Sequence, residues 1–255
     1  MGVLKTIAAA FSMFSAVPVP PFPWKEPQLR WLLCAFPLVG AAAGLTLWAW
    51  ENVWETLSFP PILWGAGACL LPVWITGGIH LDGYADVWDA LSSNAVPKRR
   101  REILRDPRCG AFAVIRLCTY FAASLALWTA LEPDGRTVLC MALAFILSRA
   151  LSGLLLLVLP VAEGSNLAEA FQSHAAGQAK PVLAVETALA SAGVLAAGGV
   201  CGVLMLAAAG LAVWRYARTA RLCFGGTSGD LAGWFLQRAE LWMLAALTLG
   251  QYMGW

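Results

Sequence analysis

Long apolar stretches alternate with short polar segments along most of this chain. A helix needs about 20 mainly apolar residues to cross a lipid bilayer. Runs of suitable length cover residues 31–50, 61–77, 111–131, 137–159 and 232–250, and residues 182–214 form a run long enough for two helices. Gly198 and Gly199 predict a tight turn near the middle of that longer run. The pattern therefore predicts an all-α, polytopic membrane helical bundle with about seven transmembrane helices.

The first residues form a shorter apolar stretch. Residues 3–17 are too few to span a bilayer comfortably, so we expect an interfacial or re-entrant helix there. Several prolines between Pro18 and Pro27 predict a non-helical connector before the first span.

The amino-acid composition is typical of a membrane protein and not of a soluble globular protein. Hydrophobic residues make up 60% of the 255 residues and charged residues 13%, whereas soluble domains carry about 25% charged residues. The formal net charge of +2 is too small to indicate nucleic-acid binding. The 7 cysteines form no paired motif, and we interpret them as small buried hydrophobic side chains. We expect one membrane-embedded catalytic domain covering residues 1–255.

Basic residues collect in three polar segments that the predicted spans place on one side of the membrane. These segments cover residues 79–109, 160–180 and 215–230, whereas the other side carries acidic residues such as Glu51 and Glu55. The positive-inside rule then predicts that all three segments face the cytoplasm from the inner cell membrane. They are expected to meet over one site at the membrane surface.

The first polar segment begins with a run of acidic residues after a histidine. Asp82, Asp86 and Asp89 are spaced i, i+4 and i+7, so on a helix their carboxylates lie on one face. Because stacked like charges repel, a divalent cation with oxygen ligands, Mg²⁺, is the natural partner. His80 lies close enough to share the site as a general base or phosphate donor. The alternative for the three aspartates is an acidic helix face that only contacts solvent. The alternative for His80 is a structural role.

Two further stretches carry residue types that bind phosphate. A flexible glycine run offers main-chain N–H groups to a phosphate, and arginine offsets negative charge. The candidate substrate-binding residues are Asp106, Arg108, Gly110, Gly225, Gly226, Gly229 and Asp230. The alternative for the glycine run is a plain turn between two spans.

These motifs together resemble the cobalamin synthase family, also called adenosylcobinamide-GDP ribazoletransferase. The resemblance rests on Thr76–Asp89, the block from Lys98 to Gly110, the block from Gly225 to Glu240, and the opening Phe14–Pro20, and it covers nearly the whole chain. It implies a magnesium-dependent membrane enzyme of the last stage of vitamin B12 assembly. Such an enzyme joins α-ribazole or its 5′-phosphate to adenosylcobinamide-GDP and releases GMP.

The resemblance also assigns roles. It implies His80, Asp82 and Asp86 as catalytic residues and Asp82, Asp86 and Asp89 as metal ligands, and it places the substrate-binding residues in the other two blocks. This chain departs from the family pattern at Leu81, where glutamate is common, at Ala90, where glycine is common, and in residues 163–171.

Two other functions fit parts of the pattern. A CDP-alcohol-type phosphotransferase of phospholipid synthesis uses a similar acidic cluster, but its motif has arginine where Asp86 follows Ala85. A transporter would carry charges through the membrane midplane, whereas the polar residues here gather in the polar segments. The expected partners are the two substrates and membrane lipid but no nucleic acid. Other late enzymes of cobalamin biosynthesis and a second copy of the chain are further candidates.

Overall fold

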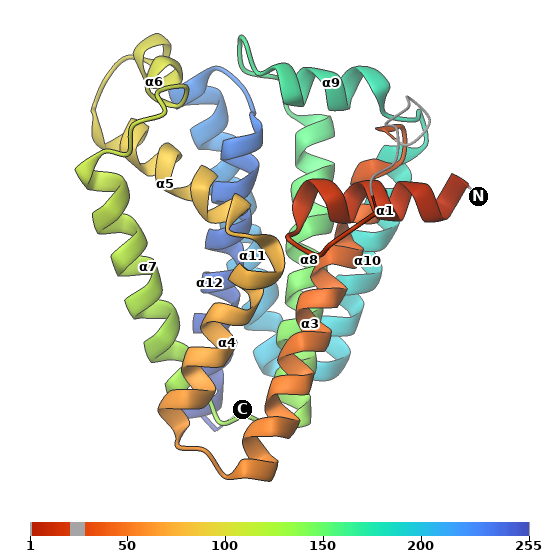
Figure 1. Ribbon diagram of the computed structural model, residues 1–255, viewed down its shortest axis with the longest axis vertical. Helices are drawn as coiled ribbons and strands as arrows, with labels where there is room; N and C mark the ends of the chain where they lie inside the picture. The colour runs from red at the N-terminus through yellow and green to blue at the C-terminus, as the bar shows by residue number, and fades with distance from the viewer. Residues whose placement is uncertain (1, 21–28, 255) are drawn as a thin grey trace.

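The computed structural model describes residues 2–20 and 29–254, and in these ranges the chain is a bundle of helices (Figure 1). Part of the proline-rich connector, residues 21–28, lies outside the described residues. The elements are α1 (Gly2–Phe14), α3 (Leu32–Leu57), α4 (Pro61–Thr76), α5 (Ile79–Ser92), α6 (Pro97–Ile103), α7 (Ala111–Ala130), α8 (Gly135–Val158), α9 (Asn166–His174), α10 (Ala179–Gly198), α11 (Val200–Thr219), the π-helical turn η1 (Ala220–Phe224) and α12 (Gly229–Tyr252).

Five helical segments of the described chain are long and apolar enough to cross a membrane. They are α3, α7, α8, α10 and the continuous stretch Val200–Phe224, and the bent pair α4 and α5 brings the number to six if it counts as one span. α12 is also long, with 24 residues, but Gln237, Arg238 and Glu240 reduce its apolar character. These three side chains are buried within the bundle. The polytopic helical membrane fold is confirmed, although length and composition support five or six spans rather than seven.

The predicted turn in the longest apolar run is confirmed. α10 ends at Gly198 and α11 begins at Val200, so Gly199 alone joins the two helices. Gly199 has a φ of 56°, a conformation that glycine adopts without a steric penalty. The Arg136 side chain donates a hydrogen bond of 2.6 Å to the carbonyl of Ala197 and fixes this end of α10.

The second predicted span ends where expected, at two glycines. Gly77 and Gly78 have φ angles of 63° and 76°, which end α4 and turn the chain by 95° into α5. The prediction of a polar loop over 79–109 was wrong in detail, because α5 and α6 lie within it. Similarly, α9 lies within 160–180. These short amphipathic helices carry too many polar residues to resemble spans in the sequence.

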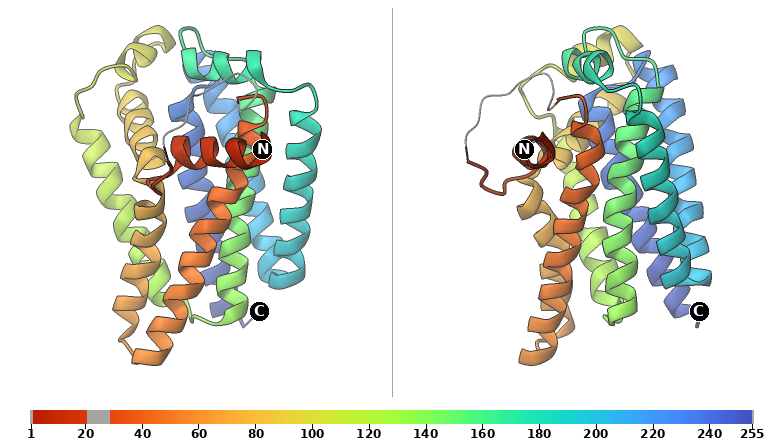
Figure 2. Two further views of the ribbon diagram at one scale, coloured as in Figure 1. Left: turned by 45° about the vertical axis from the view of Figure 1, so that its right-hand side comes forward. Right: turned by 90° about the vertical axis from the view of Figure 1, so that its right-hand side faces the viewer.

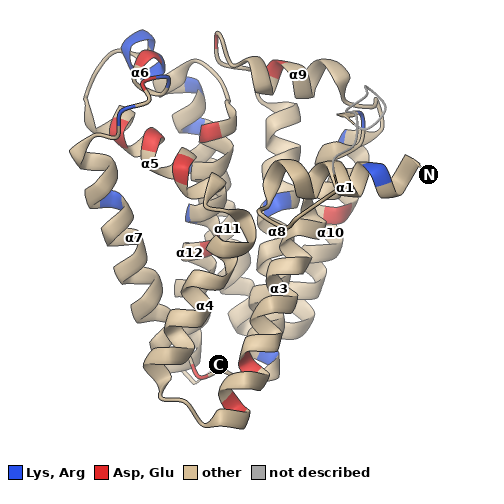
Figure 3. Cartoon of the chain, viewed as in Figure 1, with Lys and Arg blue, Asp and Glu red and all other residues tan. Residues whose placement is uncertain are grey.

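The three polar segments meet at one end of the bundle, as predicted (Figures 1 and 3). The amide of Ala162 donates to the carbonyl of Thr227 at 2.9 Å. Arg101 on α6 donates to the carbonyl of Phe224 at 3.1 Å and pairs with Glu163 at 2.9 Å. These contacts join segments that are far apart in the sequence into one surface above the spans.

The N-terminal helix α1 lies across the outside of the bundle beside α3 (Figure 2). Its 13 residues are too few to span a bilayer, and Ala9, Ala10 and Phe14 are buried against the bundle. This arrangement agrees with the interfacial helix predicted for residues 3–17.

Candidate active site

The acidic stretch forms helix α5, so Asp82, Asp86 and Asp89 share a helical face as predicted. Asp82 is exposed, and Asp86 and Asp89 are half-buried. The opposite face of α5 carries Tyr84 and Val87, which are buried in the core. The hydrophobic face thus holds the helix in place and presents the carboxylates to the space between α5, α7 and α12.

Two glycines let α5 and α12 cross at close range. A Cβ atom on Gly83 of α5 would lie 2.8 Å from the Cα and the carbonyl oxygen of Asp230. A Cβ atom on Gly233 of α12 would lie 3.1 Å from the carbonyl oxygen of His80. Since real Cβ atoms avoid distances this short, the crossing depends on glycine at position 83 and leaves little room at position 233.

This crossing brings a fourth carboxylate to the acidic face. Asp86 interacts electrostatically with Asp82 and Asp89 of its own helix and with Asp230 of α12, and Asp230 also interacts with Asp82. The sequence assigned Asp230 to substrate binding and did not indicate that it faces Asp82. Four neighbouring negative groups along this crossing repel one another, which favours a cationic ligand.

The carboxylates do not form a complete metal cage. No group of three or more His, Cys, Asp or Glu side chains in the described ranges is placed to hold one metal ion. The geometry of a helix explains this for α5, because Asp82 and Asp89 are separated by about 10 Å along the axis at ~1.5 Å per residue. One ion can therefore bind neighbouring members of the face but not all three. The set fits Mg²⁺, which often takes one or two carboxylates and completes its coordination with phosphate and water.

Asp82 lies at the junction of two cavities. The smaller cavity has a volume of about 150 Å³ and lies between α1, α3, α5, α8, α9 and α12, with His80, Asp82 and Asp230 in its wall. The larger has a volume of about 780 Å³ and lies between α5, α7 and the segment before α7. Asp82, Asp86 and Asp106 line the larger cavity. One carboxylate therefore faces two separate binding spaces.

His80 is placed to contact a molecule in the smaller cavity. The side chain is 6% exposed, and its Nε2 atom has no hydrogen-bond partner among the described residues. Its ring packs on Phe36, with 5.5 Å between the ring centroids. A buried polar atom normally has a partner, so Nε2 can still form a hydrogen bond with a ligand group.

Asp89 and Gly110 are brought together by the fold. A Cβ atom on Gly110 would overlap the carboxylate of Asp89. Gly110 is the residue before α7, so its lack of a side chain lets the start of α7 pack against α5. Gly110 was predicted as a substrate-binding residue, and the contact with Asp89 gives a packing reason for glycine at this position.

Asp106 and Arg108 form an ion pair in the segment before α7. The guanidinium of Arg108 donates to both carboxylate oxygens of Asp106, at 2.9 Å and 2.7 Å. These hydrogen bonds hold the pKa of Asp106 at about 2, well below its usual range. Arg108 is 87% exposed and Asp106 lines the larger cavity. Arg108 is therefore an exposed cation bound to a residue of the cavity wall, and it can exchange one anionic partner for another.

The glycines between η1 and α12 have different structural roles: some form the turn, and others line a cavity. The amide of Gly226 donates to the carbonyl of Ala220 at 2.9 Å, and the amide of Thr227 donates to the carbonyl of Pro160 at 2.7 Å. Gly225 has a φ of 78°, which reverses the chain after η1. Gly229 and Asp230 are the members of this run that line the smaller cavity. A phosphate is therefore expected at the start of α12 rather than over Gly226.

Comparisons with known proteins show the family to which this chain belongs. A family model described as cobalamin-5-phosphate synthase matches residues 6–248. The chain belongs to the cobalamin-5-phosphate synthase family. It is 36% identical to the adenosylcobinamide-GDP ribazoletransferase of Lachnoclostridium phytofermentans, over 97% of this chain and 95% of that protein. Its identity to the same-named protein of Pseudomonas aeruginosa is 34%, over 96% of this chain and 98% of that protein. No solved structure matches this chain.

Family membership confirms the resemblance inferred from the motifs, and the structure shows where the three departures lie. Leu81 is buried and lies in the wall of the larger cavity. Ala90 is also buried, in the hydrophobic core behind the acidic face. The segment 163–171 ends in Phe171, whose ring lines the smaller cavity.

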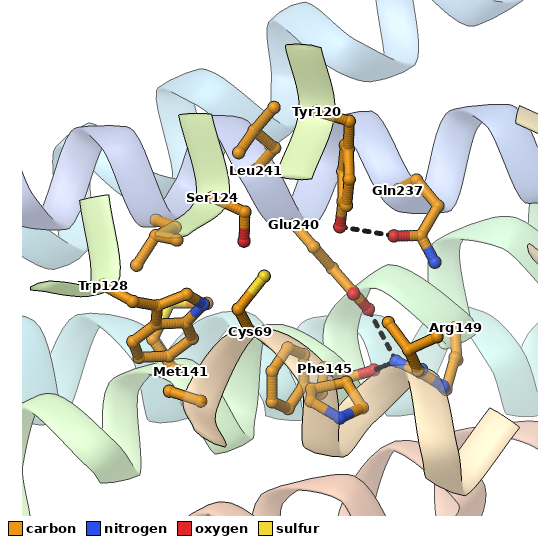
Figure 4. Close-up of a pocket in the computed structure, with 14 residues that line it drawn as sticks. Cys69, Tyr120, Ser124, Trp128, Met141, Phe145, Arg149, Gln237, Glu240 and Leu241 are labelled. Atoms are coloured by element: carbon orange, nitrogen blue, oxygen red, sulfur yellow. Dashed lines mark hydrogen bonds and ion pairs between the residues drawn. The ribbon is translucent and has the colours of Figure 1, made fainter. Parts of the chain in front are cut away.

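Behind the site, a buried polar network joins α7, α8 and α12 (Figure 4). Arg149 pairs with Glu240 at 2.6 Å, and Ser148 donates to the same Glu240 oxygen at 2.7 Å. Tyr120 donates to the side-chain carbonyl of Gln237 beside them. Arg149 and Glu240 are both buried in the interior of the protein. Their mutual pairing depends on the packing of two distant segments.

The sequence missed the aromatic wall of the smaller cavity. Phe14, Phe36 and Phe171 come from α1, α3 and α9. Each lies in an ordinary apolar or amphipathic stretch, so no local signal separates them from other core residues. Only Phe14 belonged to a motif that carried the family resemblance.

Proposed function

We propose that this chain transfers α-ribazole, or its 5′-phosphate, to adenosylcobinamide-GDP and releases GMP, in the synthesis of cobalamin. The observation that carries the proposal is the position of Asp82 between two cavities, with His80 on one side and Asp86 on the other. A transfer reaction needs two substrates to meet at one reacting centre. The related proteins carry the name of this reaction over the length of the chain.

The larger cavity is assigned to the donor. Asp106, Pro107 and Cys109 of the first polar segment line it, and its volume of about 780 Å³ leaves room for part of a large corrinoid nucleotide. The diphosphate would lie over Asp82 and Asp86, with the exposed Arg108 available to offset its charge. α12 begins at Gly229, which lines the smaller cavity with Asp82, and the start of a helix favours a phosphate group.

The reaction then follows from the position of the acceptor. A hydroxyl group of ribazole in the smaller cavity attacks the phosphorus atom attached to cobinamide. A new oxygen–phosphorus bond forms, the bond to the bridging oxygen of the diphosphate breaks, and GMP leaves with that oxygen. His80 Nε2 receives the hydroxyl proton, because it is the buried polar atom without a partner at this position.

We assign Mg²⁺ to Asp82 and Asp86, with Asp230 and Asp89 as neighbouring negative groups. When bound, the ion neutralises the charge on the phosphate oxygens and orients the diphosphate. Because the protein offers no three-ligand group in its described part, the affinity for the ion should depend on the nucleotide. The acidic face alone should bind Mg²⁺ weakly.

We place the chain in the inner cell membrane, with the site facing the cytoplasm and the apolar helix faces in contact with lipid. Support comes from the basic residues gathered at the end that carries α6 and the acidic residues at the opposite end (Figure 3). Cysteines introduced at Ser93, Ser173 and Arg221, which are exposed, should react only from the cytoplasmic side in a variant without native cysteines. Reaction of any one of them from the outside would contradict a single cytoplasmic site.

The direct test uses the purified full-length protein in detergent. Adenosylcobinamide-GDP, α-ribazole and Mg²⁺ are supplied, and GMP and cobalamin are measured together. Equal amounts of both products, dependent on all three additions, are expected. GMP release without ribazole would indicate hydrolysis instead of transfer, and the absence of both products would refute the proposal.

A further inference from the structure

Three phenylalanine rings form part of the wall of the smaller cavity. Phe14 and Phe36 have ring centroids 4.3 Å apart, and Phe14 and Phe171 have centroids 6.2 Å apart. All three side chains are at most 9% exposed. Leu33 and Leu156 also line the cavity. A cavity of about 150 Å³ lined by leucine and phenylalanine side chains is known to bind a small aromatic molecule.

Other residues in the wall of the same cavity are polar. They are His80, Asp82 and Asp230, together with Ser152 of α8 and Gly229 of α12. The His80 ring packs on Phe36, with 5.5 Å between the ring centroids, and its Nε2 atom has no hydrogen-bond partner among the described residues. The cavity therefore suits a ligand in which an apolar ring adjoins a hydroxyl-bearing group.

We infer that this cavity binds the acceptor nucleoside, with its aromatic base among Phe14, Phe36 and Phe171 and its ribose toward His80 and Asp82. The inference rests on the proposed function, in which the acceptor is ribazole. The base of ribazole is a benzimidazole with two methyl groups and no polar substituents. Its one free ring nitrogen is the only polar atom of the base that would need a partner, so its burial in a largely apolar cavity costs little. Aromatic pairs at these spacings add to the affinity beyond buried area.

The guanine of the donor is the other bicyclic ring in the reaction, and it fits less well. Guanine carries an amino group, a carbonyl and a ring N–H that need hydrogen-bond partners when buried. Phenylalanine and leucine side chains form the apolar part of the cavity wall. Burial of guanine there would leave its polar edge unpaired, at a considerable cost in binding free energy.

Leu167 on α9 provides a way to test the cavity without disturbing the core. Its side chain lines the cavity and is 46% exposed, so a larger residue can be accommodated during folding. Leu167→Trp should partly fill the cavity from its α9 wall. Leu222 of η1 lies at the same end of the bundle, is 62% exposed and lines neither cavity. Leu222→Trp is therefore the matched control.

The first measurement is the binding of α-ribazole alone to the full-length protein in detergent by calorimetry. Leu167→Trp should weaken this binding by roughly tenfold, which corresponds to about 1.4 kcal/mol. The KM for ribazole should rise by a similar factor while the KM for adenosylcobinamide-GDP stays unchanged. The loss of affinity caused by Leu167→Trp should be smaller for a nucleoside with unsubstituted benzimidazole, because the smaller base overlaps less with the tryptophan side chain.

The outcomes separate the possible occupants. A rise in the KM for adenosylcobinamide-GDP with unchanged ribazole binding would overturn the assignment in favour of the donor. No change in either would mean that the cavity takes only lipid or detergent, which also overturns it. Wild-type protein that binds ribazole with the expected Leu167 dependence but releases no GMP would uphold the base pocket and refute the proposed transfer. If Leu167→Trp and Leu222→Trp both lost the same affinity for every nucleoside, the protein would have a general folding defect, and the inference would be overturned.

Discussion

The backbone of Asp230 lies against Gly83, so close that a Cβ atom on Gly83 would come within 2.8 Å of the Asp230 Cα atom. This contact places the first turn of α12 against the acidic face of α5. It explains how Asp230, which is 148 positions after Asp82 in the sequence, becomes its electrostatic neighbour. The separation of the two cavities at Asp82 depends on the same crossing.

Replacement of Gly83 by alanine should therefore separate α5 from α12. Added methyl groups in packed contacts typically cost about 1–3 kcal/mol in the free energy of unfolding. Displacement of reacting groups by about 1 Å can reduce the rate by about a hundredfold. We expect a large loss of GMP release and a lower thermal unfolding temperature in detergent.

Gly210→Ala is the control for this substitution. Gly210 lies in α11, and a Cβ atom there would meet nothing within 4 Å. This variant should keep its activity and gain slightly in stability, since alanine favours a helix by up to about 1 kcal/mol relative to glycine. Normal activity in Gly83→Ala would show that the close crossing is not needed for the site.

The second prediction concerns Asp82 and Asp86. Asparagine at either position keeps the shape but removes a negative charge, and it should cost on the order of several kcal/mol of transition-state stabilisation. The protein should still insert into the membrane, because the change removes like-charge repulsion within α5. GMP release across a Mg²⁺ titration measures the effect.

Glu55→Gln is the matched control, since Glu55 is an exposed carboxylate on α3 at the opposite end of the bundle. It should leave the Mg²⁺ dependence unchanged. A double Asp82→Asn, Asp86→Asn variant with near-normal GMP release would mean that the acidic face is only solvated. The reacting centre would then have to lie elsewhere.

Arg108→Ala should affect the donor and leave the fold intact. Arg108 is 87% exposed and touches Asp106 at the surface, and exposed ion pairs contribute at most about 1 kcal/mol to stability. Loss of its positive charge should raise the KM for adenosylcobinamide-GDP, with ribazole binding unchanged. Arg99→Ala, which removes another exposed pair with Glu102, serves as the control. Wild-type kinetics in Arg108→Ala would remove Arg108 from the donor site.

The buried pair of Arg149 and Glu240 should show strong coupling in stability. Glu240→Leu leaves the Arg149 guanidinium buried without its charged partner, which should cost about 3–5 kcal/mol. Arg149→Met should cost a similar amount. The double variant should lose much less than the sum, because neither buried charge remains. Unfolding of the single and double variants in detergent tests this, and additive losses would show that the pair acts independently.

Local patterns in the sequence determined much of this protein. Apolar runs predicted the membrane helices, and Gly77, Gly78 and Gly199 marked turns that the structure confirms. The spacing of Asp82, Asp86 and Asp89 placed them on one face, because the period of a helix depends only on the local backbone. The family was recognisable from the same motifs.

The tertiary structure decided which segments meet. Three contacts join residues from separate segments of the chain. Asp230 lies against Gly83, Arg149 pairs with Glu240, and the carboxylate of Asp89 lies beside Gly110. The aromatic cavity likewise combines Phe14, Phe36 and Phe171 from three elements. Helix periodicity indicates only which face of each helix is buried, whereas the choice of partner depends on how glycines and large side chains fit across each interface. For this reason the sequence predicted the candidate site residues on α5, and the packing of the helices determined the two cavities that Asp82 lines.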